Sequence, residues 1–178
     1  MHSLVKSGHP AKQRAGCVIV GVFDRRTLSE PAEALDKASG NALGSALRRG
    51  DLDGKAGQTL LLHHVPRLVA DRVLLVGLGR ERDFDAGAYR KPSAAATRAV
   101  RATGAIDAVS YLTHLPVKGR DVAWAVREAS LAAQDECYRF DAFRGDKAKE
   151  DLPSLRLERL TFDVPSRTDL PAAEAGLA

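Results

Sequence analysis

The chain has 178 residues, of which 44% are hydrophobic and 28% charged, and its formal net charge is +4 at pH 7. These values are typical of one globular domain, and they exclude a disordered, collagen-like or disulfide-stabilised chain. Only 5% of the residues are aromatic, so we expect an aliphatic core between helices and strands, an α/β fold. The mild positive charge gives modest attraction to polyanions and does not by itself indicate nucleic-acid binding.

Neither a membrane segment nor a secretory signal is predicted. The longest apolar runs, residues 17–20 and 73–76, have the length of a strand, far below the roughly 20 residues that span a bilayer. Residues 1–7 lack the basic and apolar regions of a signal peptide, so we expect a cytoplasmic location. Cys17 and Cys137 have no CxxC spacing, which favours reduced, buried thiols over a disulfide.

The first third of the chain predicts a strand and two short helices. Residues 17–23 form an unbroken, β-branched apolar run, typical of a central strand covered on both faces. Ser29 is a capping residue before a proline, and the apolar spacing that follows predicts a helix ending at Gly40. A second short helix is predicted over residues 41–49.

Two strands and an alanine-rich helix follow. After a glycine-rich turn at residues 53–57, strands are predicted at 59–65 and 72–77, close enough together to form a hairpin. Residues 85–103 have a helical composition, in which Pro92 should either kink the helix or begin it.

The longest helix is predicted after a strand at residues 108–112, with Asp121 as its cap. Two apolar stripes lie on nearly opposite sides of this helix. Our hypothesis is that the second stripe docks on another domain or subunit; the alternative is that its residues are amphipathic surface residues over a loop. The first stripe is Val122, Val126, Ala129, Ala133 and Cys137, and the second is Trp124, Leu131 and Tyr138.

The remaining residues predict a loop, a last strand and a terminal helix. Residues 141–154 are charged and indicate a loop. The period-two apolar pattern then slips near residues 158–159, which requires either a bulge or a strand that starts at Arg159. We expect residues 1–166 to form one domain and residues 167–178 to begin a linker helix toward a further domain, since so short a helix is unstable alone.

The residues that commonly carry catalysis show no catalytic spacing. The adjacent His63 and His64 would point to opposite faces of a strand and cannot share a metal ion. Ser45 lies in no GxSxG motif, and Cys17 has no nearby base to activate its thiol. The aspartate and glutamate side chains are interpreted as charges exposed to solvent. We therefore predict no catalytic, cofactor-binding or metal-binding residue in this chain. No HExxH motif occurs among the five histidines, His2, His9, His63, His64 and His114.

The best candidate for ligand binding is the segment 77–82, Gly-Leu-Gly-Arg-Glu-Arg, which follows a buried strand and offers amides for a phosphate. The third glycine of a dinucleotide fingerprint is missing, which favours a structural role for Gly77 and Gly79, and Gly21 is likewise expected to be a packing glycine. Three basic pairs are interpreted as solvated surface or as a phosphate-binding patch after assembly: Arg25 with Arg26, Arg48 with Arg49, and Arg80 with Arg82.

Several segments together resemble the N-terminal domain of the bacterial leucyl (cytosol) aminopeptidase family, in order and over essentially the whole chain. The family pattern is a continuous helix where this sequence has Pro92. The segments that carry the resemblance are residues 5–8, 17–23, 47–63, 72–82, 117–120 and 162–165.

The resemblance implies a macro-domain-like, three-layer fold in which helices flank a mixed sheet. It also implies a hexameric metallo-aminopeptidase whose separate C-terminal domain holds two divalent ions, manganese or zinc, and cleaves N-terminal residues with a metal-activated water. No catalytic residue carries over onto this chain, so we expect a noncatalytic assembly domain whose partners are its own catalytic domain and further copies. Alternative functions are a DNA-binding regulatory surface, as in some relatives, and a macro-like module for an ADP-ribose-type ligand at residues 77–79.

Overall fold

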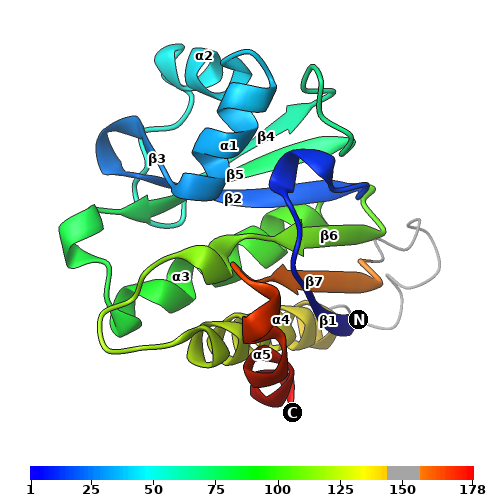
Figure 1. The fold of residues 1–178 in the computed structure, drawn as a ribbon. Coiled ribbons are helices and arrows are strands. Elements are labelled where there is room, and N and C mark those ends of the chain that lie inside the picture. Colours follow the sequence, from blue (N-terminus) through cyan, green and yellow to red (C-terminus); the bar gives the residue numbers. More distant parts are fainter. Residues whose placement is uncertain (144–156) are drawn as a thin grey trace.

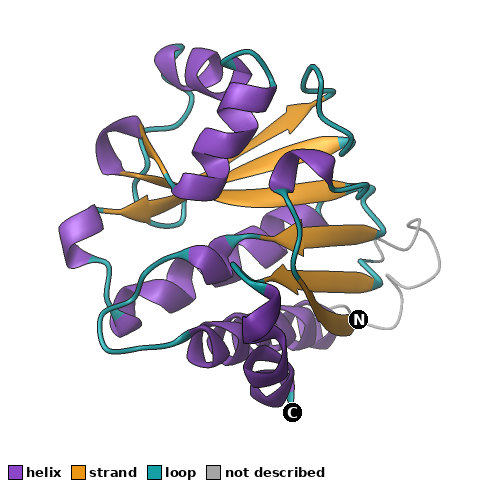
Figure 2. Ribbon diagram, in the orientation of Figure 1, coloured by secondary structure: helices purple, strands orange, loops and turns teal. Residues whose placement is uncertain are grey.

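The computed structural model describes residues 1–143 and 157–178. Within these residues the strands form one seven-stranded mixed sheet in the order β1-β7-β6-β2-β5-β4, with β3 paired to β2. Helices cover both faces of this sheet, as Figures 1 and 2 show. The three-layer α/β prediction is confirmed.

Five neighbouring strands, from β1 across to β5, are parallel, whereas β4 and β3 run antiparallel to β5 and β2. The carboxyl ends of the five parallel strands therefore lie at one edge of the sheet. The strands are β1 (His2–Lys6), β2 (Cys17–Phe23), β3 (Thr27–Leu28), β4 (Thr59–His63), β5 (Arg72–Gly79), β6 (Asp107–Ser110) and β7 (Arg159–Asp163).

The helices divide into two groups, and each group packs on one face of the sheet. The first group shares an apolar core with the side chains of Val18, Val20 and Leu75, and the second with those of Ile19 and Leu74. The first group is α1 (Glu30–Ala38) and α2 (Ala42–Arg48), and the second is α3 (Ala86–Arg101), α4 (Val122–Phe143) and α5 (Leu170–Leu177).

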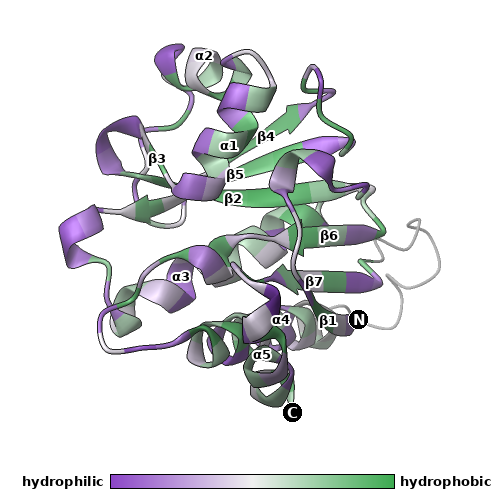
Figure 3. Cartoon of the chain, in the orientation of Figure 1, coloured by the Kyte–Doolittle hydropathy of each residue, from purple (hydrophilic) through white to green (hydrophobic). Residues whose placement is uncertain are grey.

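Strand β2 is the centre of the sheet, and all seven of its residues are buried. Its side chains alternate between the two cores, which is why its sequence is an unbroken apolar run. Figure 3 shows the same concentration of hydrophobic residues along β2 and its neighbours. The predicted central strand is confirmed with its predicted bounds.

The predicted hairpin is also present. Strand β4 pairs antiparallel with β5, from Thr59 opposite Val76 to His63 opposite Arg72. In the glycine-rich turn before β4, the Gln58 side-chain oxygen accepts hydrogen bonds from the amides of residues 53, 54 and 55 at 3.0–3.2 Å. This one side chain orders the turn.

Both short helices are confirmed, but Ser29 does not cap α1. It occupies the N-cap position, yet its hydroxyl is buried and has no hydrogen-bond partner within the described part of the chain. Its amide donates instead to the carbonyl oxygen of Gly21 at 3.1 Å. The residue therefore joins α1 to β2 through its backbone rather than through its side chain.

Helix α3 begins at Ala86 and not at Pro92. Asp85 is the N-cap, and its carboxylate accepts a hydrogen bond from the Ala88 amide at 3.0 Å. Pro92 lies inside the helix and is buried, although it has no amide hydrogen for the helical ladder. The chain thus keeps the continuous helix of the family pattern despite its proline.

Asp121 caps α4 as predicted, since its carboxylate accepts a hydrogen bond from the Trp124 amide at 2.8 Å. The centre of the first apolar stripe is buried in the core. The three residues of the second stripe differ in their surroundings. The ring of Trp124 packs on the ring of Tyr89 in α3, with 5.3 Å between the ring centroids. Leu131 and Tyr138 are exposed to solvent, at 42% and 76% of their surface. Trp124 therefore finds its partner inside the domain, and docking stays a prediction for Leu131 and Tyr138 only.

The last part of the chain differs from the prediction in its helix boundary. Helix α4 continues to Phe143, so residues 141–143 are helical, and the rest of the predicted loop lies outside the described residues. Strand β7 starts at Arg159, which confirms the second of the two proposed explanations for the shifted pattern. Strands β1 and β3 have no counterpart in the sequence prediction.

Helix α5 packs against α4 and β1, and its Ala173 is fully buried. A Cβ atom on Gly176 would lie 2.5 Å from the carbonyl oxygen of Ala123, so the two helices are in close contact. The predicted linker segment, residues 167–178, therefore packs on the domain through α5. Its continuation into a further domain stays a prediction.

The contact between β5 and the glycine-rich turn can be tested with Gly77→Ala. The new Cβ would lie 2.0 Å from the Lys55 carbonyl oxygen, so we expect a loss of about 1–3 kcal/mol in the free energy of unfolding measured by urea denaturation. Gly87→Ala is the control, because the nearest atom to its Cβ is a side-chain oxygen at 3.4 Å. Equal stability of the two variants would contradict this packing.

Candidate functional site

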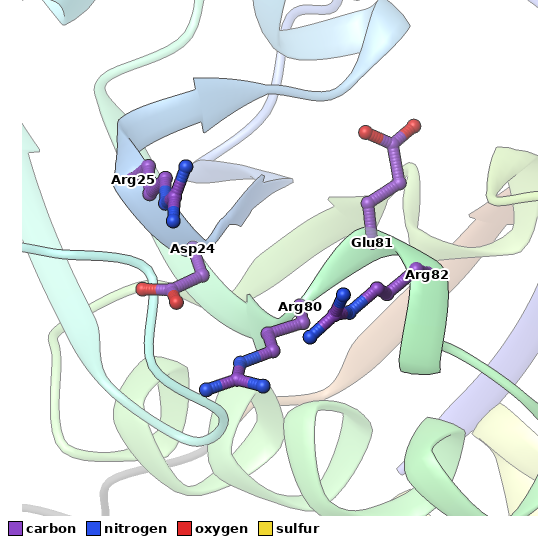
Figure 4. Close-up of a pocket in the computed structure, with 5 residues that line it drawn as sticks. All are labelled: Asp24, Arg25, Arg80, Glu81 and Arg82. Atoms are coloured by element: carbon purple, nitrogen blue, oxygen red, sulfur yellow. The ribbon is translucent and has the colours of Figure 1, made fainter.

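Two turns at the carboxyl ends of β2 and β5 enclose a surface hollow of about 600 Å³. Its lining side chains are those of Asp24 and Arg25, which follow β2, and of Arg80, Glu81 and Arg82, which follow β5. Figure 4 shows these five residues on the two turns. We call this feature the arginine hollow.

A second cavity of about 410 Å³ adjoins the arginine hollow and shares Asp24 and Arg25 with it. Arg26, Asp53 and Lys55 complete its lining. The Arg26 guanidinium lies 3.4 Å from the Asp53 carboxylate, and because both side chains are over 40% exposed this ion pair contributes little to stability. The structure thus brings two of the three predicted basic pairs to one end of the sheet.

The third pair, Arg48 and Arg49, is exposed at the end of α2. Ser45 is a helix residue as predicted, and its hydroxyl accepts a hydrogen bond from Arg48 at 3.0 Å. A Cβ atom on Gly50 would lie 3.9 Å from the Arg26 guanidinium, so the end of α2 is adjacent to the turn after β2. All three pairs can therefore contribute to one basic surface.

The turn after β2 has an unusual backbone. Arg25 and Arg26 both have φ of 61°, in the left-handed region that residues other than glycine rarely adopt. The Arg26 amide donates to the Asp53 carbonyl oxygen at 3.1 Å, which holds the turn in place. Such local strain is often found where side chains must be presented to a ligand.

The amides of the two glycines in segment 77–82 do not face the hollow. The Gly77 amide donates to the Gln58 carbonyl oxygen at 2.7 Å, and the Gly79 amide donates to the Gly54 carbonyl oxygen at 2.8 Å. The structural interpretation of these two glycines is confirmed, and their amides are not available to the nucleotide-type ligand of the alternative prediction. Gly21 is a packing glycine as expected, since its Cβ would lie 2.5 Å from the Leu78 side chain.

The histidines and cysteines show no shared metal site. His63 ends β4, and His64 has φ of 49° outside the strand. Within residues 1–143 and 157–178, no three His, Cys, Asp or Glu side chains lie close enough together to hold a metal ion. Burial raises the pKa of Cys17 to about 12, so its thiol stays protonated at neutral pH and is not an activated nucleophile.

A buried polar cluster that the sequence analysis missed lies at the carboxyl ends of β6 and β7. Asp163 is fully buried, and its carboxylate lies 2.9 Å from Nε2 of His114, which belongs to the short helix η4 (Leu112–His114). The Thr113 hydroxyl donates to the Asp163 carbonyl oxygen. The expectation that all carboxylates are solvated is wrong for Asp163, because the strand that ends there carries it into the core.

Tyr111 connects this cluster to the segment before β2. Its ring packs on that of His114 at 5.0 Å, and its hydroxyl donates to the Gly8 carbonyl oxygen at 2.7 Å while accepting from the Gln13 side chain at 2.8 Å. Burial and the negative charge of Asp163 raise the pKa of Tyr111, so its hydroxyl remains a hydrogen-bond donor. Through these contacts the cluster holds together three segments that are distant in sequence, namely residues 8–13, residues 111–114 and Asp163.

The His114–Asp163 pair can be tested by a double-mutant cycle. His114→Ala leaves the buried carboxylate without its partner, so we expect a loss of roughly 3 kcal/mol in the free energy of unfolding. Adding Asp163→Leu to this variant should restore part of the loss, because the uncompensated charge is then gone. His63→Ala, an exposed control, should cost less than about 0.5 kcal/mol. Additive effects of the two substitutions would contradict the pairing.

No helix in the described residues is both long and apolar enough to cross a membrane. A family model described as "Cytosol aminopeptidase family, N-terminal domain" matches residues 19–147. A probable cytosol aminopeptidase of Thioalkalivibrio sulfidiphilus is 52% identical over 174 residues, and one of Dechloromonas aromatica is 47% identical over 178 residues. These matches cover 98% and 100% of this chain but 34% and 35% of the relatives, so the chain spans about a third of their length.

Two kinds of solved structure share the fold. A mutant of tomato leucine aminopeptidase has a TM-score of 0.66 at 17% identity, covering 98% of this chain and 35% of that one. A Trypanosoma brucei macrodomain in complex with ADP has a TM-score of 0.66 at 15% identity, covering 99% and 69%. The macro-domain-like fold expected from the resemblance is therefore confirmed.

Proposed function

Because the chain belongs to the cytosol aminopeptidase family and corresponds to its N-terminal domain, we propose that it is the noncatalytic assembly domain of a metal-dependent leucyl aminopeptidase. One observation carries this proposal: relatives named as aminopeptidases match the whole chain over only about a third of their own length. The remaining two thirds of such a protein have room for a separate catalytic domain.

In this proposal the peptidase chemistry belongs to that further domain. Two divalent ions, manganese or zinc, would be held there by aspartate, glutamate and lysine side chains and would activate the water that attacks the peptide carbonyl. The chain described here would position the catalytic domains, in the hexamer and the cytoplasmic setting that the family resemblance implies. Peptide substrates would bind outside this chain.

The proposal predicts that the purified 178-residue chain does not hydrolyse leucine amide, with or without added Mn²⁺ or Zn²⁺. Release of ammonia or leucine would be measured by chromatography, with the Thioalkalivibrio relative as a positive control. Metal-dependent turnover by the chain alone, abolished by a chelator, would overturn the assignment of catalysis to another domain.

A second candidate function is a DNA-binding regulatory surface. The observation that favours it is that the three basic pairs gather around the carboxyl ends of β2 and β5, with Arg26 adjacent to the end of α2. Guanidinium groups bind phosphates, and contacts from several copies would add up in an assembly. The carboxylates of Asp24 and Glu81 within the same hollow weaken this candidate, because they repel a uniform polyanion.

The DNA-binding candidate predicts salt-dependent binding that falls when Arg48 and Arg49 are neutralised. Fluorescence anisotropy with a duplex should show a slope of log K against log salt that decreases by about one for each phosphate contact removed. Arg159→Ala, at the other end of the sheet, is the control and should leave the slope unchanged. An absence of binding at low salt would remove this candidate.

A further inference from the structure

A separate hollow of about 320 Å³ lies between the segment after β6, the start of α4 and the segment after β7. We call it the α4 hollow. Much of its lining is apolar and aliphatic, and it has a size at the lower end of the roughly 300–1,000 Å³ typical of small-molecule sites. The apolar lining includes Leu115, Val117, Val122, Pro165 and Ala172.

Four ionisable side chains line the same hollow. His114 and Arg120 are the basic groups, and Asp121 and Asp169 are the acidic groups. Because Nε2 of His114 is already bound by the Asp163 carboxylate, the charged groups open to a ligand are the Arg120 guanidinium and the two carboxylates, which suit a ligand that carries both charges. This composition differs from that of the arginine hollow, where three arginines face two carboxylates.

The basic groups are held in position by their neighbours. The fully buried Asp163 carboxylate binds Nε2 of His114, which fixes the plane of the imidazole ring. The Arg120 guanidinium lies over the ring of Trp124 at 5.3 Å, in a cation–π contact. Neither side chain needs to lose much rotational freedom to receive a ligand.

The acidic groups are also anchored. Asp121 and Asp169 each accept a hydrogen bond from a backbone amide, at 2.8 Å from Trp124 and 3.1 Å from Ser166. A carboxylate has about four acceptor positions, so these single bonds leave both groups able to accept further donors. A ligand ammonium group would find two anchored acceptors in this hollow.

We propose that the α4 hollow binds a free α-amino acid with an aliphatic side chain. Arg120 would receive its carboxylate near the positive end of the α4 dipole, and Asp121 and Asp169 would receive its ammonium group. The aliphatic lining would cover the ligand side chain. This inference rests on the chemistry of the hollow alone and does not depend on the proposed peptidase function.

The probe for this site is L-leucine, titrated into the 178-residue chain by calorimetry. We expect saturable binding of one molecule per chain and a change in the emission of Trp124, which is the only tryptophan. Leucinamide lacks the carboxylate, 4-methylpentanoate lacks the ammonium group and glycine lacks the side chain, so each should bind at least about tenfold more weakly. Equal affinity for leucine and leucinamide would overturn the proposal, as would no heat up to about 10 mM leucine.

A pair of variants on the same segment separates binding from folding. Arg120→Gln should weaken leucine binding at least about tenfold while changing the melting temperature little, because Arg120 is exposed and its cation–π contact with Trp124 is weak at the surface. Arg127→Gln is the matched control, since Arg127 is exposed on α4 and is absent from the lining of the hollow. Identical affinities of the two variants would show that Arg120 receives no carboxylate and would refute the site.

Discussion

Burial of β2 on both faces is the constraint on which the rest of this domain depends. A strand between two parallel neighbours must have both faces covered, and here α1 and α2 cover one face while α3 and α4 cover the other. The same parallel arrangement places the carboxyl ends of five strands at one edge. The arginine hollow, the buried His114–Asp163 pair and the α4 hollow all lie where chain segments leave that edge.

At this edge the backbone is largely occupied by structural contacts. The amides of Gly77 and Gly79 donate hydrogen bonds to the turn at residues 54–58. The backbones of β5 and this turn lie so close together that a side chain at Gly77 would collide with the turn, which is why glycine is needed there. These two glycine amides are therefore not available to a ligand at this edge. For that reason the guanidinium and carboxylate groups around the two hollows, rather than a glycine-rich loop, carry the functional proposals.

The spacing of apolar residues along the sequence predicted those helices and strands whose apolar residues are the ones buried in the structure. The unbroken apolar run of β2, the β4–β5 hairpin and the Asp121-capped α4 all follow from local patterns. Strand β1 could not be predicted, because it is short and its residues are only partly buried at the edge of the sheet. Neither alternative for the second stripe, docking on another domain or a surface position over a loop, was right for Trp124, because its partner Tyr89 lies on α3 and local spacing does not show that contact.

The polar groups were harder to predict than the strands, because their roles depend on contacts between distant residues. Asp163 ends an apolar run, and only the position of His114, 49 residues away, makes its burial tolerable. The same pair holds His114 at the wall of the α4 hollow, so one interaction both joins two segments of the domain and shapes the lining of this cavity. The carboxylate of the fully buried Asp163 thus fixes the position of the half-buried His114 ring, and the ligand site that we propose lies beside that ring.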